Sequence, residues 1–332
     1  MKKTLIQAAK IIIPVALAIY LSWYFIASMG EEEKQKVSSV FSEANYFIIF
    51  LSIVFAWISH VLRAARWNLL LEPMGYKPSF WNNYHAVMIG YFMNLLLPRA
   101  GELSRAGIIS KTDNVPFEKG FGTIVAERVI DTLVLGCIVL VTMLLQYDKF
   151  MEMMSQLGNL NGEKSGNNIT LYIGIGIAVA GIVALVIYLK NERFRNKIKQ
   201  LVRGFIEGIL TIVRMKKFVP FFLYTIGIWF FYVTLYLVCF YALESTAGIP
   251  VKILMLGFIG GAIGIILVQG GIGVYPLLIA TAISIYKEEL HNDQLFPILI
   301  GLGWVMWLAQ TFLLVAGGAV SFYLVSKKAI KE

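Results

Sequence analysis

The chain has 332 residues, of which 58% are hydrophobic and only 15% are charged, and its formal net charge is +9. Soluble domains carry about a quarter charged residues, so the composition excludes an ordinary soluble protein and predicts an all-α, polytopic membrane protein. The basic residues lie mainly between the apolar runs, and this placement predicts contact with anionic lipid headgroups and no nucleic-acid partner.

Eight uncharged runs define the expected membrane helices, and we interpret residues 1–332 as one transmembrane domain. The runs are 11–30, 44–62, 78–98, 132–147, 165–189, 218–243, 253–286 and 294–326. They are much longer than the ~10 alternating residues of a barrel strand, which favours helices. The first run has 20 uncharged residues and exceeds the ~7–15 residues of a signal-peptide core, so we expect it to be retained as a helix.

The segment between the fifth and sixth runs, residues 190–217, sets the expected orientation. It holds nine Lys or Arg against two Glu, with apolar residues interspersed. This pattern is typical of a basic amphipathic helix on the cytoplasmic surface. We therefore expect a multi-pass protein of the cytoplasmic (inner) membrane with both termini in the cytoplasm.

Two stretches do not fit simple spans. Residues 253–286 are 34 uncharged residues, about 51 Å as one helix at ~1.5 Å per residue, and glycines and Pro276 interrupt the centre. We predict broken, re-entrant hairpins near 82–111 and 253–286, although two full spans at 253–286 are the alternative. One full span would flank each hairpin on either side, as an inverted repeat with the site where the broken helices meet. The four flanking spans are 44–62, 120–147, 218–243 and 294–326.

The first break, "NLLLPRAGELSR" (94–105), combines a proline and a glycine with charged residues. We expect Asn94 to satisfy backbone groups that the break exposes, and Glu102 to lie where a new helix begins. Arg99 and Arg105, with the amides of that helix, would form a positive site suited to a phosphate. The alternative is that both arginines only mark the membrane edge and reach toward lipid headgroups.

A second charged cluster lies within the next apolar helix, at Glu127, Arg128 and Asp131. Each charge at membrane depth costs on the order of 2.5–3.5 kcal/mol on insertion scales, so these side chains must find partners. Pairing with the first cluster is the plain structural interpretation. We favour a shared polar cavity in which at least one arginine is available to a ligand.

Two further arginines, Arg63 and Arg66, directly follow the second uncharged run. They are either ordinary positive-inside residues or an access path for anionic headgroups. His60, His85 and His291 are too scattered to suggest a metal site, and no nucleotide-binding motif is present. We therefore expect neither a metal nor a cofactor.

The motifs "RAARW" (63–67), "NLLLPRAGELSR" (94–105), "AERVID" (126–131) and "QGGIGVYP" (269–276) together resemble the lysylphosphatidylglycerol synthase transmembrane, or flippase-like, family. The resemblance covers nearly the whole chain, and it departs from the family at Tyr275, near where an acidic residue is common. It implies lipid translocation or binding by the membrane part alone, without an aminoacyl-transferase domain. From the last motif we add five expected site residues: Gln269, Gly270, Gly271, Gly273 and Tyr275.

We expect a lipid flippase, not an enzyme, that moves a lipid with an anionic headgroup, of phospholipid or polyprenyl-phosphate type. Its partners would be such membrane lipids, and the sequence leaves open whether the chain forms a homo-oligomer. The main alternative is a membrane-embedded transferase acting on a lipid-linked sugar or phosphate. A structural membrane partner, in which the buried charges are only ion pairs, is a second alternative.

Overall fold

The computed structural model describes residues 29–97, 100–147, 215–292 and 294–331, with the isolated positions 20, 23, 27, 192 and 196. Within these ranges every regular element is helical, as the composition predicted. The chain divides into two compact units, one of residues 1–128 and 216–332 and the other of residues 129–215. The predicted helices at 11–30 and 165–189 and the basic segment 190–217 lie almost entirely outside the described residues.

Four described helices are long and apolar enough to cross a membrane, and they correspond to the four predicted flanking spans. They are α3 (Tyr46–Leu71), α6 (Phe117–Leu145), α10 (Phe218–Cys239) and α14 (Leu295–Lys331). Helix α3 differs from its prediction, because it continues nine residues beyond the expected end at Leu62. The uncharged run stops at Arg63, but the helix continues because the protein interior accepts the arginines that follow.

Helices α3 and α10 form an antiparallel pair at the centre of the first unit. At one end the amide of Asn45 donates to the carbonyl of Ala242 at 2.8 Å, and at the other Lys217 pairs with Glu72 at 2.7 Å.

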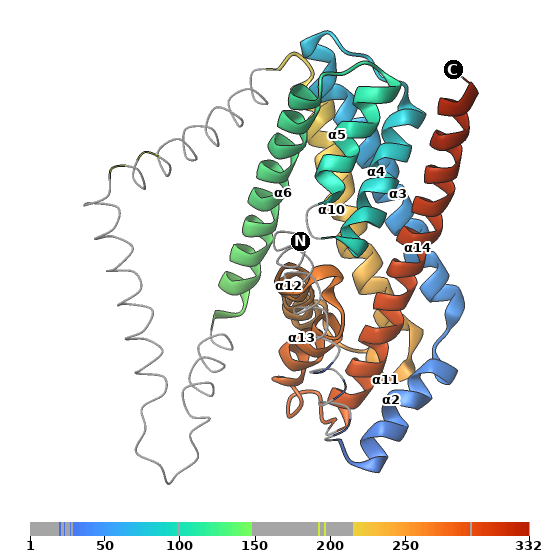
Figure 1. The fold of residues 1–332 in the computed structure, drawn as a ribbon. Helices are drawn as coiled ribbons and strands as arrows, with labels where there is room; N and C mark the ends of the chain where they lie inside the picture. The colour runs from blue at the N-terminus through green and yellow to red at the C-terminus, as the bar shows by residue number, and fades with distance from the viewer. Residues whose placement is uncertain are drawn as a thin grey trace. The chain divides into compact units, whose positions relative to one another are not determined.

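Two broken helical hairpins enter the first unit from opposite ends of the α3–α10 pair (Figure 1). The first, α4 (Phe80–Leu96) and α5 (Ala100–Thr112), follows α3 through the short helix η1 (Glu72–Met74). The second, α12 (Val251–Leu267) and α13 (Val274–Ser284), follows α10 through η2 (Phe240–Ala242) and α11 (Glu244–Ala247). The helix–break–helix prediction is confirmed for both stretches.

The lengths of α12 and α13 decide between a hairpin and two full spans. The two helices have 17 and 11 residues, about 26 Å and 17 Å at ~1.5 Å per residue. A helix that spans the ~30 Å hydrocarbon core needs ~17–25 residues, so α12 lies at the lower limit and α13 is too short to cross. The geometry therefore favours a re-entrant hairpin over the alternative.

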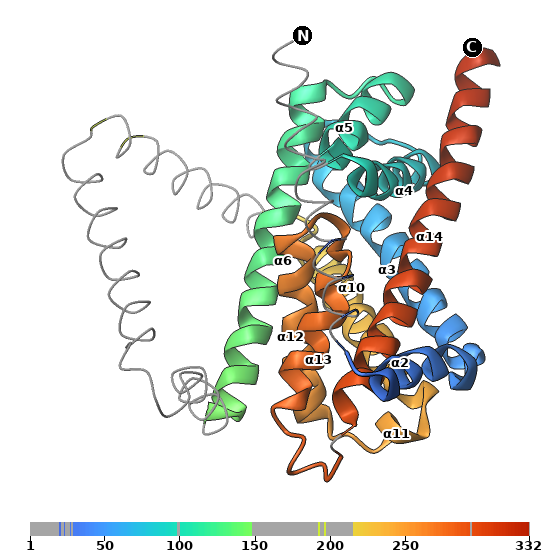
Figure 2. The ribbon, with the colours of Figure 1, turned by 60° about the horizontal axis from the view of Figure 1, so that its bottom comes forward.

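Helix α14 runs past both hairpins, as Figures 1 and 2 show from two directions. Its first half packs on α13, where a Cβ at Gly303 would lie 2.7 Å from Pro276 Cα. Its second half packs on α4, where a Cβ at Gly318 would collide with the side chain of Phe92. Its glycines thus let this helix approach both hairpins at backbone distance.

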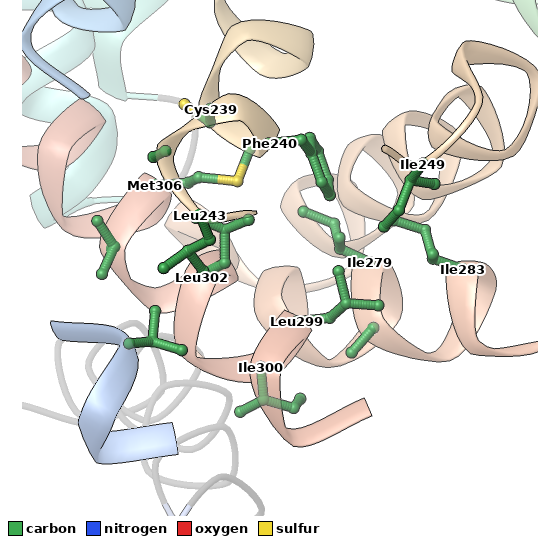
Figure 3. Packing of buried hydrophobic residues seen from close by; sticks show 14 of the residues in the cluster. Cys239, Phe240, Leu243, Ile249, Ile279, Ile283, Leu299, Ile300, Leu302 and Met306 are labelled. Carbon is green, nitrogen blue, oxygen red and sulfur yellow. The ribbon is translucent and has the colours of Figure 1, made fainter. Parts of the chain in front are cut away.

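The apolar core of the first unit has two parts. The larger lies between the end of α10, the second hairpin and the first half of α14, with α2 (Glu31–Glu43) at its edge (Figure 3). The smaller surrounds Trp67 of α3, which is fully buried against α4, α5 and the start of α6. The charged residues of the site adjoin the smaller core.

The second unit contains the remainder of α6, from Val129 to Leu145. Asp131 is buried there, whereas Leu140, Leu144 and Leu145 are exposed by 58%, 67% and 78%. An apolar helix with this much exposed leucine is typical of a surface that contacts lipid.

Candidate functional site

The break in the first hairpin is short and closely packed. Helix α4 ends at Leu96, Leu97 is extended, and α5 begins at Ala100. The side chain of Asn94 accepts a hydrogen bond from the amide of Gly101 at 2.8 Å, so it satisfies a backbone group at the break, as predicted. Pro98 and Arg99 lie outside the described residues, so the role expected for Arg99 stays a prediction.

A fully buried ion-pair group joins this hairpin to α3 and α6. The Arg105 guanidinium contacts Glu127 Oε2 at 2.8 Å, and Arg66 Nε lies 3.4 Å from Glu127 Oε1. None of the three side chains is more than 4% exposed. Arg105 also lies over the ring of Trp67, at 4.2 Å from its centroid, and the Trp67 indole donates to Thr123 at 2.9 Å.

A second ion pair, between Arg128 and Glu102 at 2.9 Å, is half-exposed. This pair joins α5 to α6, as the Arg105–Glu127 pair does. The two charged clusters therefore meet, as both interpretations of the sequence required. The pairing interpretation is confirmed for Glu102, Arg105, Glu127 and Arg128. A shared cavity stays a prediction.

Asp131, the third acidic residue expected in this site, follows Glu127 by one turn of α6 and is buried. It belongs to the second unit, and its expected role stays a prediction.

Arg63 and Arg66 are buried to 3% and 0% exposure and lie inside the protein, not at its edge. Arg66 donates to Thr225 Oγ1 at 3.1 Å besides its contact with Glu127. Arg63 donates to the Tyr232 hydroxyl at 3.4 Å. From the sequence we expected either ordinary positive-inside residues or an access path for headgroups. In the structure both arginines instead lie in or beside the buried ion-pair group.

Three residues that the sequence did not single out for this site extend it along α3. The ring of His60 lies 4.5 Å from that of Tyr91, whose hydroxyl is 3.2 Å from the hydroxyl of Tyr232. His60 is 5% exposed, and its Nδ1 has no hydrogen-bond partner among the described residues. The available signal was the spacing of His60, Arg63 and Trp67, which places them on one face of a helix.

The break in the second hairpin depends on glycines with positive φ. Gly270, Gly271 and Gly273 have φ of 67°, 71° and 69°, a region that L-residues with side chains rarely adopt. The indole of Trp307, on α14, donates to the carbonyl of Gly270 at 2.6 Å. This hydrogen bond satisfies one of the groups that the break in the short helix η3 (Gln269–Gly271) exposes.

The two hairpin tips meet, because a Cβ at Gly270 would lie 3.4 Å from Leu95 of α4. Tyr275 packs inside the second hairpin, where a Cβ at Gly261 would lie 2.8 Å from its ring. The side chain of Gln269 lies outside what the structure describes. Within the described ranges, no group of three or more His, Cys, Asp or Glu side chains is placed to hold a metal ion.

Comparisons with known proteins identify the family of the chain. The pattern of the family described as "Lysylphosphatidylglycerol synthase TM region" matches residues 11–313. No solved structure matches the chain.

Three curated relatives share shorter segments. A UPF0104 membrane protein of Methanocaldococcus jannaschii is 30% identical over 122 residues, 36% of each chain. One of Pyrococcus horikoshii is 34% identical over 137 residues, 40% of this chain and 38% of the relative. The chain thus spans less than two fifths of the length of these two relatives. The glycosyltransferase AglD of Haloferax volcanii is 30% identical over 105 residues, 31% of this chain and 17% of that protein.

Proposed function

Because the chain belongs to the family of lysylphosphatidylglycerol synthase TM regions, we propose that it moves a lipid with an anionic headgroup across the cytoplasmic membrane. The lipid would be a phospholipid or a polyprenyl phosphate, and both termini would lie in the cytoplasm. On this proposal the chain performs no covalent chemistry.

The observation that carries the proposal is the buried ion-pair group around Glu127. In the first unit, four arginines accompany two carboxylates: Arg63, Arg66, Arg105 and Arg128 with Glu102 and Glu127. Arginine presents a planar fork of donors that matches phosphate, so a cluster of arginines suits an anionic ligand.

The pairing also supplies a mechanism for accepting and releasing a phosphate. Glu127 Oε2 occupies the end of the Arg105 guanidinium, and the phosphate of a lipid could replace it there. Glu127 would keep its contact with Arg66 while Arg105 exchanges one anionic partner for another. Exchange avoids the large penalty of leaving a buried charge unpaired, so the headgroup can enter and leave.

The meeting of the two hairpin tips supports a transport path. A broken helix at membrane depth is tolerated only where protein or water satisfies its backbone. Here Asn94 and Trp307 satisfy groups at the two breaks. Short hairpins that enter from opposite ends would place the charged group within reach of both sides of the membrane.

Purified protein in vesicles with an acyl-labelled phosphatidylglycerol tests the proposal. Dithionite outside the vesicles bleaches only the outer leaflet, so transport is seen as bleaching of the label beyond the outer half. We expect Glu102→Gln to slow this movement by about tenfold, which corresponds to ~1.4 kcal/mol. Glu72→Gln removes a lysine-paired carboxylate elsewhere in the same unit that is 35% exposed, against 22% for Glu102, and this variant should move lipid like the wild type.

Equal rates in the wild type and Glu102→Gln would remove this ion pair from the path. Wild-type vesicles that bleach no more than empty vesicles would overturn the transport proposal itself.

The alternative is a membrane-embedded transferase acting on a lipid-linked sugar or phosphate. The similarity to the glycosyltransferase AglD over 105 residues favours it. Chromatography of lipids extracted from the same vesicles separates the two functions. A chemically altered lipid would support the transferase, whereas unaltered lipid that has changed leaflet supports the flippase.

A further inference from the structure

Beyond the ion pairs, a group of polar side chains continues the site along α3. It consists of His60 on α3, Tyr91 on α4 and Tyr232 on α10, with Arg63 as the link to the arginines. A Cβ at Gly90, the residue before Tyr91, would lie 2.6 Å from Arg105 Cγ, which places this group beside the buried ion pairs. We call it the hydroxyl extension.

The hydroxyl extension holds hydrogen-bonding capacity that the described residues do not use. His60 Nδ1 is buried and has no hydrogen-bond partner in the part of the chain that the structure describes, and His60 as a whole is 95% buried. Arg105 Nε is also buried without a hydrogen-bond partner among the described residues. Buried polar groups are normally satisfied, so orphans beside an arginine group point to a missing polar ligand.

The chemistry of the extension suits hydroxyls and does not suit an amine. Tyr91, Tyr232 and the imidazole of His60 can each donate or accept a hydrogen bond, as can a hydroxyl group of a ligand. An ammonium group would instead be repelled by the guanidinium groups of the nearby arginines, because both carry a positive charge. The two carboxylates of this unit's cluster, Glu102 and Glu127, are already held by arginines.

Resting on the proposed function, we infer that the hydroxyl extension binds the uncharged, hydroxyl-bearing part of the headgroup of a phosphate-containing lipid. Arg105 takes the phosphate, and the extension takes a glycerol or sugar attached to it. The preferred substrate is therefore a polyol phospholipid and not one with an amine on its headgroup.

Three acyl-labelled lipids in the dithionite assay test this inference: phosphatidylglycerol, phosphatidic acid and phosphatidylethanolamine. The wild type should move phosphatidylglycerol fastest, and phosphatidylethanolamine slowest. Tyr91→Phe and Tyr232→Phe keep the rings and remove the hydroxyls, so each should slow phosphatidylglycerol about tenfold. Neither should change the rate for phosphatidic acid, which has no headgroup hydroxyl beyond its phosphate and so reports whether the variant is folded.

Tyr84→Phe is the matched control, because the Tyr84 hydroxyl accepts from Trp57 at 3.0 Å on a different part of α4. It should leave all three rates unchanged. Excess glycerol 3-phosphate on both sides of the vesicles should also leave the phosphatidylglycerol rate unchanged. A complete block by this soluble compound would make a free phosphate ester, and not a lipid, the ligand.

The outcomes separate this inference from the function on which it rests. If all three lipids move at one rate, the proposed transport stands and the headgroup preference is wrong. Equal slowing of phosphatidylglycerol and phosphatidic acid by the two variants would also refute the role of the hydroxyls. If the wild type moves none of the three lipids, the proposed function fails and this inference fails with it.

Discussion

Glu127→Gln should destabilise the protein strongly, because Glu127 holds two buried guanidinium groups at once. Its side chain is 1% exposed and lies 2.8 Å from Arg105 and 3.4 Å from Arg66. The substitution keeps the shape but removes the negative charge, so both arginines lose their compensating partner. Breaking a buried ion pair from one side costs about 3–5 kcal/mol in the free energy of unfolding.

Glu102→Gln supplies the comparison within the same cluster. Its ion pair with Arg128 is exposed by 22% and 40% on the two sides, so solvent screens both charges. A pair of this kind contributes roughly 0–1 kcal/mol. Unfolding by SDS in mixed micelles, followed by tryptophan fluorescence, measures both variants. Equal and small effects would refute the assignment of Glu127 as the buried partner.

A double-mutant cycle separates the charge pair from general disruption of packing. If Arg105→Gln and Glu127→Gln act through one ion pair, the double variant should be less destabilised than the two single effects added together. Additive losses would mean that the contact between Arg105 and Glu127 is not the source of the effect.

Two further predictions concern the hairpin breaks. Trp307→Phe removes the donor to the Gly270 carbonyl and should lower the free energy of unfolding by about 1–3 kcal/mol in the same assay; an unchanged value would show that this carbonyl finds another donor. Gly101→Ala should lower the free energy of unfolding by about 1–3 kcal/mol, because its Cβ would collide with the backbone of Gly90. Gly107 lies on the same helix with open space around it, so Gly107→Ala should raise the free energy of unfolding by up to ~1 kcal/mol. Equal effects of the two substitutions would contradict the close packing of the hairpin.

The sequence predicted the two hairpins well because backbone chemistry determines them locally. A proline with a glycine at 98–101, and three glycines within 270–273, strongly disfavour a continuous helix, because proline lacks an amide hydrogen and each glycine costs about 1 kcal/mol. The meeting of the two charged clusters was also predictable, since isolated charges at membrane depth are too costly to remain unpaired.

The positions of Arg63 and Arg66 could not be predicted from charge alone. A count of uncharged residues ends the helix at the first arginine, but α3 continues to Leu71 because a buried carboxylate from α6 faces Arg66. Likewise, Tyr91 and Tyr232 are 141 residues apart and meet only because α4 and α10 both pack on α3. Contacts of that kind depend on the tertiary arrangement, which no local pattern contains.

The shared support that α14 gives to both hairpins limits how the molecule can open. Its glycines hold one hairpin on each half of the same helix, and its indole holds the tip of the second. If one hairpin moves away from α14, the packing of that hairpin on α14 is lost while the other hairpin stays in contact. If both hairpins move away at once, both sets of contacts are lost. If the protein transports lipid as proposed, this difference in cost would favour opening on one side at a time, which would limit the leakage of small ions.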